Sequence, residues 1–366
     1  MNDKTKPSGS GSAYDIIHFE ALGPEAEHLK EEIAKAQQSG ELPKNHEYLI
    51  TPSNVQEYLE ENQGTVLPEI ITTKTHSIFP ETYLAGTKKS IITRSAGYDH
   101  VEDLAEKANI ASLREYCVNA VAQTAMKLLY AAAGELNHYT KNTEAFERKD
   151  SRAFLELNEN VILTVFGVGK IGRRIYELSL ANGLTVQGVD IRQKELNEVY
   201  QGTVRFVSKE DAIRSSNIII NAMNLTKNEQ SRFYNVGYFS EEFLSKAPPG
   251  LIFINVTRGE IAPESGLLAL YESGRIGGIG LDVFSNVSVF ATLLNGRERT
   301  DVGKDHVAAM AMVKSSIARN SNIYVQPHQG FNSDVAAKAK AVEAIKHVVS
   351  WYKNGGRCFD EQLPYY

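Results

Sequence analysis

The sequence predicts an α/β protein with a doubly wound parallel sheet and a second, smaller α/β domain. Two observations carry this prediction. Short apolar runs typical of buried strands alternate with helical patterns along most of the chain. In addition, residues 161–190 read in succession as a strand, a glycine-rich turn, a helix and a second strand that ends on Asp190.

The glycine-rich turn reads GVGKIG at residues 167–172 and follows the apolar run at 161–166. Gly167 allows a sharp turn, Gly169 lets the backbone approach a pyrophosphate, and Gly172 lets the helix pack closely on the strand. The free N–H groups at the helix start favour an anion. Asp190 lies near the spacing of about 20 residues expected for a carboxylate that binds the adenosine ribose. This pattern predicts a Rossmann domain that binds NAD.

Asp190 favours NAD over NADP, because a carboxylate repels the 2′-phosphate of NADP. Arg192 follows two residues later and could soften this preference, although a solvated surface arginine is the simpler interpretation.

Composition bounds the class of protein. Hydrophobic content of 42% and charged content of 23% are typical of a globular chain, and the net charge of −6 argues against nucleic acid as a partner. The two cysteines make neither a disulfide framework nor a metal site, and no apolar run has the length of a membrane span. Residues 1–12 lack the apolar centre of a signal peptide and predict a disordered tail. A cytoplasmic enzyme is the default expectation.

The chain before the glycine turn predicts a small parallel α/β unit without a phosphate loop, which we assign as a flavodoxin-like substrate domain. Its last predicted strand, at 89–93, is followed by small residues whose N–H groups could hold a carboxylate, although by itself this segment is only a turn. A long apolar helix is predicted at 119–136. The other predicted strands are at 14–19, 48–50 and 70–73, and the helices at 25–38 and 54–62.

After Asp190 the alternation continues and completes a sheet of about six or seven strands. Further strands are predicted at 203–207, 217–221, 251–256, 277–281 and 323–325. Helices are predicted at 208–214, 240–246, 263–273, within 289–317, and at 334–352. We place Val335, Ala339, Val342, Ile345, Val348 and Val349 on the apolar side of the last helix, which should return to the first domain. The predicted substrate domain is therefore 13–125 with 327–366, and the NAD-binding domain is 126–326.

Taken together, the motifs resemble the NAD-dependent D-isomer-specific 2-hydroxyacid dehydrogenases, the family of D-lactate, glycerate and phosphoglycerate dehydrogenases. The resemblance covers roughly residues 85–350. It rests on TRSAGYDHV at 93–101, YCVNAVAQTA at 116–125, GVGKIG at 167–172, INVTRGEI at 254–261, GRIGGIGLDVF at 274–284 and QPHQGFNS at 326–333.

The resemblance implies roles for individual residues. His328 matches the general acid/base, and Arg258 matches the arginine that binds the substrate carboxylate and polarises its carbonyl. The N–H groups of Ala96 and Gly97 would hold the carboxylate, and Tyr116 would contact the substrate. The implied cofactor contacts are Gly167, Gly169, Lys170, Ile171, Gly172, Asp190, Met223, Asn224, Val256, Thr257 and Asp282.

Structural interpretations stay open beside these roles. His328 could be a satisfied histidine after a proline, Arg258 could form a surface or interdomain ion pair, and Tyr116 could simply pack in the core. His76 could line the cleft, but a surface position is the simpler expectation.

The sequence departs from the family pattern. The family usually places a Glu that hydrogen-bonds the catalytic histidine where Val287 stands here. Asn286 could orient the imidazole instead. Without the carboxylate the histidine should lose its proton at a lower pH, and because 2-keto acid reduction needs the protonated imidazole, it should fade at a lower pH than in relatives with Glu. The extra residues at 293–313 could also supply a replacement, from Glu298, Asp301, Asp305 or His306, or form a surface or dimer contact. The segment 221–226 likewise lacks the usual His and Pro.

The resulting expectation is an NAD-dependent oxidoreductase for a small 2-hydroxy or 2-keto acid. We expect a cytoplasmic homodimer with no metal, no nucleic acid and no membrane partner. The alternative is an NAD(H)-sensing binding protein of the same fold with weak or lost catalysis.

Overall fold

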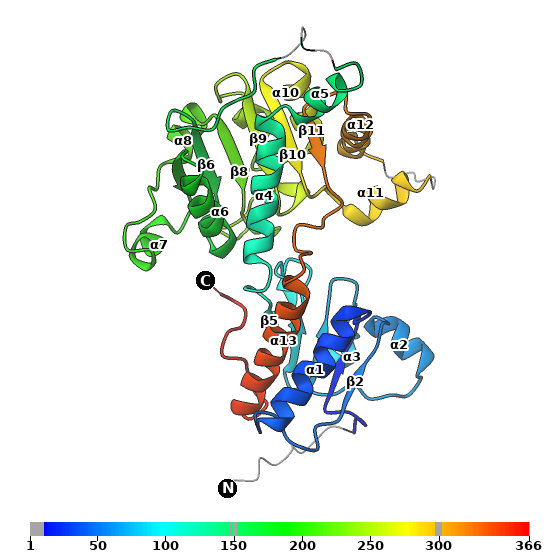
Figure 1. The fold of residues 1–366 in the computed structure, drawn as a ribbon. Helices are drawn as coiled ribbons and strands as arrows, with labels where there is room; N and C mark the ends of the chain where they lie inside the picture. The colour runs from blue at the N-terminus through cyan, green and yellow to red at the C-terminus, as the bar shows by residue number, and fades with distance from the viewer. Residues whose placement is uncertain (1–10, 147, 149–151, 297–301, 366) are drawn as a thin grey trace. The chain divides into compact units, whose positions relative to one another are not determined.

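The structure is a computed structural model that describes residues 11–146, 148, 152–296 and 302–365. It divides into two units (Figure 1): unit 1 is Met1–Cys117 with Asn332–Tyr366, and unit 2 is Val118–Phe331. The first boundary between the units lies after Cys117, earlier than the predicted boundary at 125/126. The whole of α4 (Val118–Ala133) belongs to unit 2, because it is one continuous helix whose neighbours include α6, β9 and β10. The second boundary falls after the predicted 326/327. The predicted tail lies, up to residue 10, outside the described residues.

Unit 1 is a parallel sheet in the order β2-β1-β3-β4-β5, with all described strand pairs parallel. This is the flavodoxin-like order, which confirms the predicted fold class. The strands are β1 (Ile16–His18), β2 (Tyr48–Ile50), β3 (Ile70–Thr73), β4 (Lys89–Thr93) and β5 (Ala108–Ser112). The helices are α1 (Pro24–Gln38), α2 (Val55–Glu61), α3 (Glu81–Leu84), the 3₁₀ turn η1 (Glu102–Leu104) and α13 (Ala336–Lys353). Strand β5 was missed because ANIAS mixes polar with small residues.

The helices α1 and α13 lie side by side on one face of this sheet (Figure 1). Leu29 and Ile33 of α1 share a buried cluster with Ala344 and Val348 of α13. Trp351 is fully buried beside them and donates its indole N–H to Ser90 Oγ of β4 at 2.9 Å. The predicted return of the last helix to the first domain is therefore confirmed.

The buried face of α13 differs from the predicted one. Val335 and Val342 are 68% and 45% exposed, whereas Lys340 and Glu343 are buried. Apolar spacing alone assigned the face, but α13 turns its two charged residues inward because unit 1 offers them specific partners, described below.

Unit 2 is a parallel sheet in the order β11-β10-β9-β8-β6-β7. The strands are β6 (Ile162–Phe166), β7 (Thr185–Val189), β8 (Ile218–Asn221), β9 (Leu251–Asn255), β10 (Ile276–Leu281) and β11 (Ile323–Val325). The helices besides α4 are α5 (Leu136–Asn142), α6 (Lys170–Ala181), α7 (Gln193–Val199), α8 (Lys209–Ser215), α9 (Glu241–Leu244), the 3₁₀ turn η2 (Gly259–Ile261), α10 (Glu264–Glu272), α11 (Val287–Leu294) and α12 (Lys304–Ala318). Figure 1 shows α4 and α6 next to one another in this unit.

The predicted strand at 203–207 is reduced to a single bridge between Phe206 and Gly188 of β7. Two backbone hydrogen bonds join Gly188 to Arg205 and Val207. The segment ends at Val207, because the next residue, Ser208, caps α8 by accepting from the N–H of Asp211. If this bridge is counted as strand 3, then β6, β7, β8, β9 and β10 are strands 1, 2, 4, 5 and 6, and they follow the order 3-2-1-4-5-6 of a dinucleotide-binding sheet. The switch point of such a sheet lies between strands 1 and 4, which are β6 and β8 here. Across the described residues, no helix combines the length and the apolarity that crossing a membrane requires.

Candidate functional site

The glycine turn after β6 has the close contacts that its sequence predicts. Gly167 has a φ of 83°, and a Cβ there would lie 2.7 Å from the backbone nitrogen of Met223 after β8. A Cβ on Gly172 would lie 1.9 Å from the carbonyl oxygen of Gly167. In contrast, a Cβ on Gly169 would meet no described atom within 4 Å. Gly169 is therefore open on the side where a ligand's phosphates would approach.

Helix α6 starts directly in this turn, with Gly169 as its N-cap, Lys170 and Ile171 as its first residues, and no side-chain cap. Its first turn contains no acidic residue. The N–H groups of this first turn and the helix dipole therefore favour an anion.

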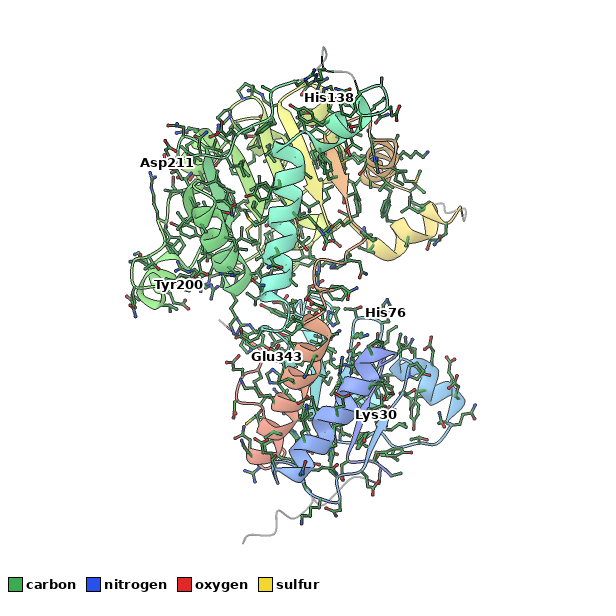
Figure 2. All side chains as sticks on the ribbon, in the orientation of Figure 1. Lys30, His76, His138, Tyr200, Asp211 and Glu343 are labelled. Carbon is green, nitrogen blue, oxygen red and sulfur yellow. The ribbon has the colours of Figure 1, made fainter. Side chains whose placement is uncertain are left out.

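Asp190, at the end of β7, forms a hydrogen bond with the glycine turn through its carboxylate. Its Oδ2 atom accepts a hydrogen bond from the N–H of Val168 at 2.8 Å, and Oδ1 accepts from the N–H of Arg192 at 2.9 Å. The guanidinium Nε of Arg192 lies 3.8 Å from the same Oδ1. Tyr200 (labelled in Figure 2) donates its hydroxyl to the carbonyl of Val168 at 2.9 Å. The turn, the carboxylate and the cation thus form one connected group.

The ends of β8 and β9 are joined by a second network. Asn221 donates from Nδ2 to Asn255 Oδ1 at 3.0 Å and to Thr257 Oγ1 at 2.9 Å. Asn221 also accepts from the N–H of Met223 through Oδ1 at 3.1 Å, and Asn224 accepts from Asn235 through its carbonyl at 2.7 Å. The predicted contacts Met223, Asn224, Val256 and Thr257 therefore lie on neighbouring strand ends, with Val256 buried.

The backbone of Arg258 is fixed by a hydrogen bond to its carbonyl and by the close packing of the next residue. Asn255 donates from Nδ2 to the carbonyl of Arg258 at 2.9 Å. A Cβ on the next residue, Gly259, would lie 2.1 Å from the backbone of Phe284 and Ser285. The half-buried guanidinium donates from Nη1 to the carbonyl of Thr257 at 2.9 Å. Only a glycine allows Arg258 to approach the segment after β10 so closely.

His328 lies in the loop after β11, and Asp282 at the end of β10 organises that loop. The buried carboxylate of Asp282 accepts from the N–H of Gln329 through Oδ1 at 2.9 Å and from the N–H of Gly330 through Oδ2 at 2.8 Å. Gln326 adds a bond from Nε2 to Oδ1 at 3.2 Å. Between these anchors His328 adopts a φ of 53°, in the left-handed region. Its ring packs edge-on against Phe331, with ring centroids 6.3 Å apart.

The position of the missing family carboxylate lies at the start of α11. Val287 is 43% exposed, and Asn286 has an exposed side chain and a left-handed backbone. In the inserted segment, Asp305 accepts from the N–H and hydroxyl of Ser265 at 2.9 and 2.6 Å, and His306 is buried. Glu298 and Asp301 lie outside the described residues.

A buried carboxylate that the sequence analysis did not single out supports the same segment. Glu264, at the start of α10, accepts from the N–H of Ser285 at 2.6 Å and from its hydroxyl at 2.9 Å. Burial raises the pKa of Glu264 to about 7. Asn255 was missed as well. It is a polar residue ending the apolar run LIFIN, and that contrast could have indicated it.

The predicted substrate contacts of unit 1 lie at the carboxyl edge of its own sheet. Ala96 and Gly97 are half-buried in the turn after β4. The N–H of Tyr116 donates to Glu343 of α13 at 2.8 Å, and burial raises the pKa of Tyr116 well above its ordinary value. His76 is 82% exposed on its side chain and lies 3.2 Å from Glu20. Both Glu343 and His76 are labelled in Figure 2.

No group of three or more histidine, cysteine, aspartate or glutamate side chains able to hold a metal ion occurs in the described part of the chain. Cys117 is buried and Cys358 half-buried, both as free thiols.

Comparisons with known proteins place this geometry in context. Residues 126–330 match the family model described as D-isomer specific 2-hydroxyacid dehydrogenase, NAD binding domain. A putative D-lactate dehydrogenase from Dictyostelium discoideum is 29% identical over 56% of this chain, and 4-methyl-2-oxopentanoate reductase A from Aspergillus oryzae is 25% identical over 55%. The matched segment spans 60% of the length of each of these two relatives.

A crystal structure of D-lactate dehydrogenase from Aquifex aeolicus, complexed with NAD and lactic acid, has the same fold. The TM-score is 0.72 at 20% identity, with 93% of this chain and 96% of that chain covered.

Proposed function

Because the chain belongs to the D-isomer specific 2-hydroxyacid dehydrogenase family, we propose that it transfers a hydride between NAD(H) and a small D-2-hydroxy acid or its 2-keto acid. The observation that carries the proposal is that both candidate catalytic residues are anchored on the one segment after β10. Gly259, next to Arg258, packs on the backbone of Phe284 and Ser285, and Asp282 binds the two N–H groups that follow His328.

Residues 126–330 correspond to the NAD binding domain of the family, and the residues present fit this cofactor. The open face of Gly169 and the uncapped start of α6 suit a pyrophosphate. The carboxylate of Asp190 suits the adenosine ribose hydroxyls. We propose that the remaining contacts with NAD are made by Lys170, Ile171, Met223, Asn224, Val256, Thr257 and Asp282.

In the proposed reaction, bound NADH supplies the hydride that C2 of the 2-keto acid accepts. Arg258 binds the substrate carboxylate in a bidentate manner and donates a hydrogen bond to the C2 oxygen, which polarises the carbonyl. The His328 imidazolium donates its proton to that oxygen, and in the reverse direction the neutral imidazole removes it. The N–H groups of Ala96 and Gly97 hold the carboxylate, and Tyr116 contacts the rest of the substrate.

The test is NADH oxidation followed by absorbance with a panel of 2-keto acids, for the wild type and for His328→Ala. We expect His328→Ala to lower kcat by roughly 10²- to 10⁴-fold, the usual contribution of a general acid. His138→Ala, in α5 of the same unit, is the matched control and should retain wild-type turnover. Full activity in His328→Ala would overturn the assignment of His328.

A second candidate function is an NAD(H)-sensing protein with weak or lost catalysis. The observation in its favour is the exposed Val287 at the position of the family carboxylate. Tight NADH binding without turnover of any 2-keto acid would favour this candidate.

The homodimer and the cytoplasmic location stay predictions. Light scattering on the purified protein would measure the first, and fractionation of the source cells would measure the second.

A further inference from the structure

Two asparagines are buried in unit 2 at the carboxyl edge of its sheet, where β8 and β9 lie next to each other (Figure 1). Asn221 is the last residue of β8, Asn255 is the last residue of β9, and the two are paired in register. Their exposed fractions are 0% and 1%. A buried carboxamide is unfavourable unless its oxygen and its N–H₂ group both find partners. The partners of these two side chains therefore matter.

The partners of Asn255 fix the orientation of its carboxamide. Oδ1 accepts from the N–H of Thr257 at 3.2 Å, and Nδ2 donates to the carbonyl of Arg258 at 2.9 Å. A backbone N–H can only donate and a carbonyl can only accept, so the reversed carboxamide would bring like groups together at both contacts. Only a side chain with one acceptor and one donor at these two places satisfies both backbone groups.

Asn221 is oriented in the same way. Its Oδ1 atom accepts from the N–H of Met223 at 3.1 Å, and its Nδ2 atom donates to Asn255 Oδ1 at 3.0 Å and to Thr257 Oγ1 at 2.9 Å. The result is an ordered chain of hydrogen bonds. It runs from the N–H of Met223 through both carboxamides to the carbonyl of Arg258. In a buried chain of this kind, each bond polarises and strengthens the next.

Asn255 binds the peptide units on both sides of the one that holds the Arg258 guanidinium. The N–H of Thr257 belongs to the peptide unit before Thr257, and the carbonyl of Arg258 belongs to the unit after Arg258. The unit between them supplies the carbonyl of Thr257, to which Nη1 of Arg258 donates at 2.9 Å. One carboxamide thus fixes the backbone on either side of the carbonyl that binds the guanidinium.

The other end of the hydrogen-bond chain lies against the glycine turn. The backbone nitrogen of Met223, which donates to Asn221, is the atom that would lie 2.7 Å from a Cβ on Gly167. Gly167 directly follows β6, and β6 is the neighbour of β8 in the sheet. The same few contacts therefore connect the turn that we propose holds the pyrophosphate with the arginine that we propose binds the substrate.

We propose that Asn221 and Asn255 are positioning residues for the reaction, which set the place of Arg258 relative to the cofactor. This inference rests on the proposed function and adds two residues to it. Asn255 acts through the backbone of Arg258. Asn221 acts one step further away, because its Nδ2 atom holds the oxygen of Asn255 and so directs the donor of Asn255 toward Arg258.

Asn255→Asp tests the inference most directly. The change keeps the shape of the side chain and the acceptor for Thr257, but a second oxygen replaces the donor to the Arg258 carbonyl. At alkaline pH, where the new carboxyl group is ionised, two acceptors face each other and the backbone of Arg258 must move. We expect kcat/KM for the 2-keto acid to fall by roughly 10²-fold, the scale of a displacement of about 1 Å. KM should rise by about tenfold or more, because Arg258 binds the substrate carboxylate before the reaction.

The affinity for NADH, measured by fluorescence titration, should stay close to that of the wild type, because Asn255→Asp leaves the glycine turn intact. If Asn255→Asp loses its cooperative thermal transition, Asn221→Asp replaces it. That change keeps the acceptor for the N–H of Met223 and removes both donors. It should raise KM in the same direction by a smaller factor.

Asn322→Asp is the matched control. Asn322 is buried at the opposite, amino edge of the same sheet, where Nδ2 donates to the carbonyls of Ala132 and Gly277 at 2.9 Å each. The change removes buried donors of the same kind, so it should lower the thermal stability but keep the wild-type kcat and KM.

A wild-type KM in Asn255→Asp overturns the inference. An equal loss of affinity for NADH and for the 2-keto acid also overturns it, because it would show a general disturbance of unit 2. A wild type that binds NADH but turns over none of the 2-keto acids would instead overturn the proposed function.

Discussion

Gly330 lies so close to Asp282 that its N–H donates to the Oδ2 atom at 2.8 Å, and an added Cβ would lie 2.6 Å from the same oxygen. Gly330→Ala must therefore displace either the loop that carries His328 or the Asp282 carboxylate that anchors this loop. Because a displacement of about 1 Å costs on the order of 10²-fold in rate, we expect kcat for 2-keto acid reduction to fall by about that factor. Steady-state kinetics with NADH measure the effect.

Gly303→Ala is the control for this change, because a Cβ at Gly303 meets no described atom within 4 Å. Its kcat should equal that of the wild type. Equal kcat in Gly330→Ala would mean that the contact with Asp282 does not position His328.

The glycine turn should separate stability from cofactor binding. Gly172→Ala places a Cβ 1.9 Å from the carbonyl of Gly167 and should lower the free energy of unfolding by about 3 kcal/mol or more. Gly169→Ala has open space and should leave stability nearly unchanged, but should weaken NADH binding by at least about tenfold, because its methyl group would stand where we propose that the pyrophosphate binds. Urea denaturation and NADH fluorescence titration measure the two effects. A reversed pattern would contradict the assigned roles.

Asp190 and Arg192 should together decide the choice of cofactor. Asp190→Ala removes the carboxylate that repels the 2′-phosphate of NADPH. The guanidinium of Arg192, which lies 3.8 Å from that carboxylate in the wild type, is then left to pair with the 2′-phosphate. We expect the NADPH to NADH ratio of kcat/KM to rise by roughly 10- to 100-fold. Asp190→Ala combined with Arg192→Ala should lose most of this gain. An unchanged ratio in the single variant would argue against the ribose contact.

Glu264 should make the stability of the protein depend on pH. Burial raises its pKa from 4.5 to about 7 in the folded state. Between these values the folded protein binds more protons than the unfolded chain, so the free energy of unfolding falls as pH rises. Relative to the wild type, Glu264→Gln should therefore gain up to about 3 kcal/mol between pH 4.5 and pH 8, and little beyond.

Denaturation at a series of pH values tests this expectation. Glu272→Gln, at the exposed end of the same helix, should follow the wild type throughout. Parallel curves for wild type and Glu264→Gln would show that Glu264 does not titrate in this range.

The sequence was a good guide where a feature depends on neighbouring residues. The parallel sheets, the glycine turn and the acid at the end of β7 all follow from local periodicity and spacing. The strand predicted at 203–207 was wrong, because only Phe206 of this segment pairs, in a single bridge to Gly188 of β7 that local periodicity does not reveal. The apolar face assigned to α13 was partly wrong, since the buried Lys340 finds its partner, Glu25, on a distant segment.

The same limit applies to the candidate site. His328 and Arg258 could be named from motifs, but the clamp of Asp282 on Gln329 and Gly330 depends on the pairing of β10 with β11. The support of Ser285 by Glu264 likewise joins a helix to a loop, and no spacing in the sequence indicates it.

The division of unit 1 between two stretches of chain has a consequence for the order of folding. Leu29 and Ile33 complete their cluster only with α13, and the whole of unit 2 lies between them. Closing so long a loop costs more conformational entropy than joining β6 to its neighbours within unit 2. We therefore expect amides of β6 to become protected from hydrogen exchange before those of β1 during refolding, which pulse labelling would measure. Simultaneous protection would mean that the two units form in one cooperative step.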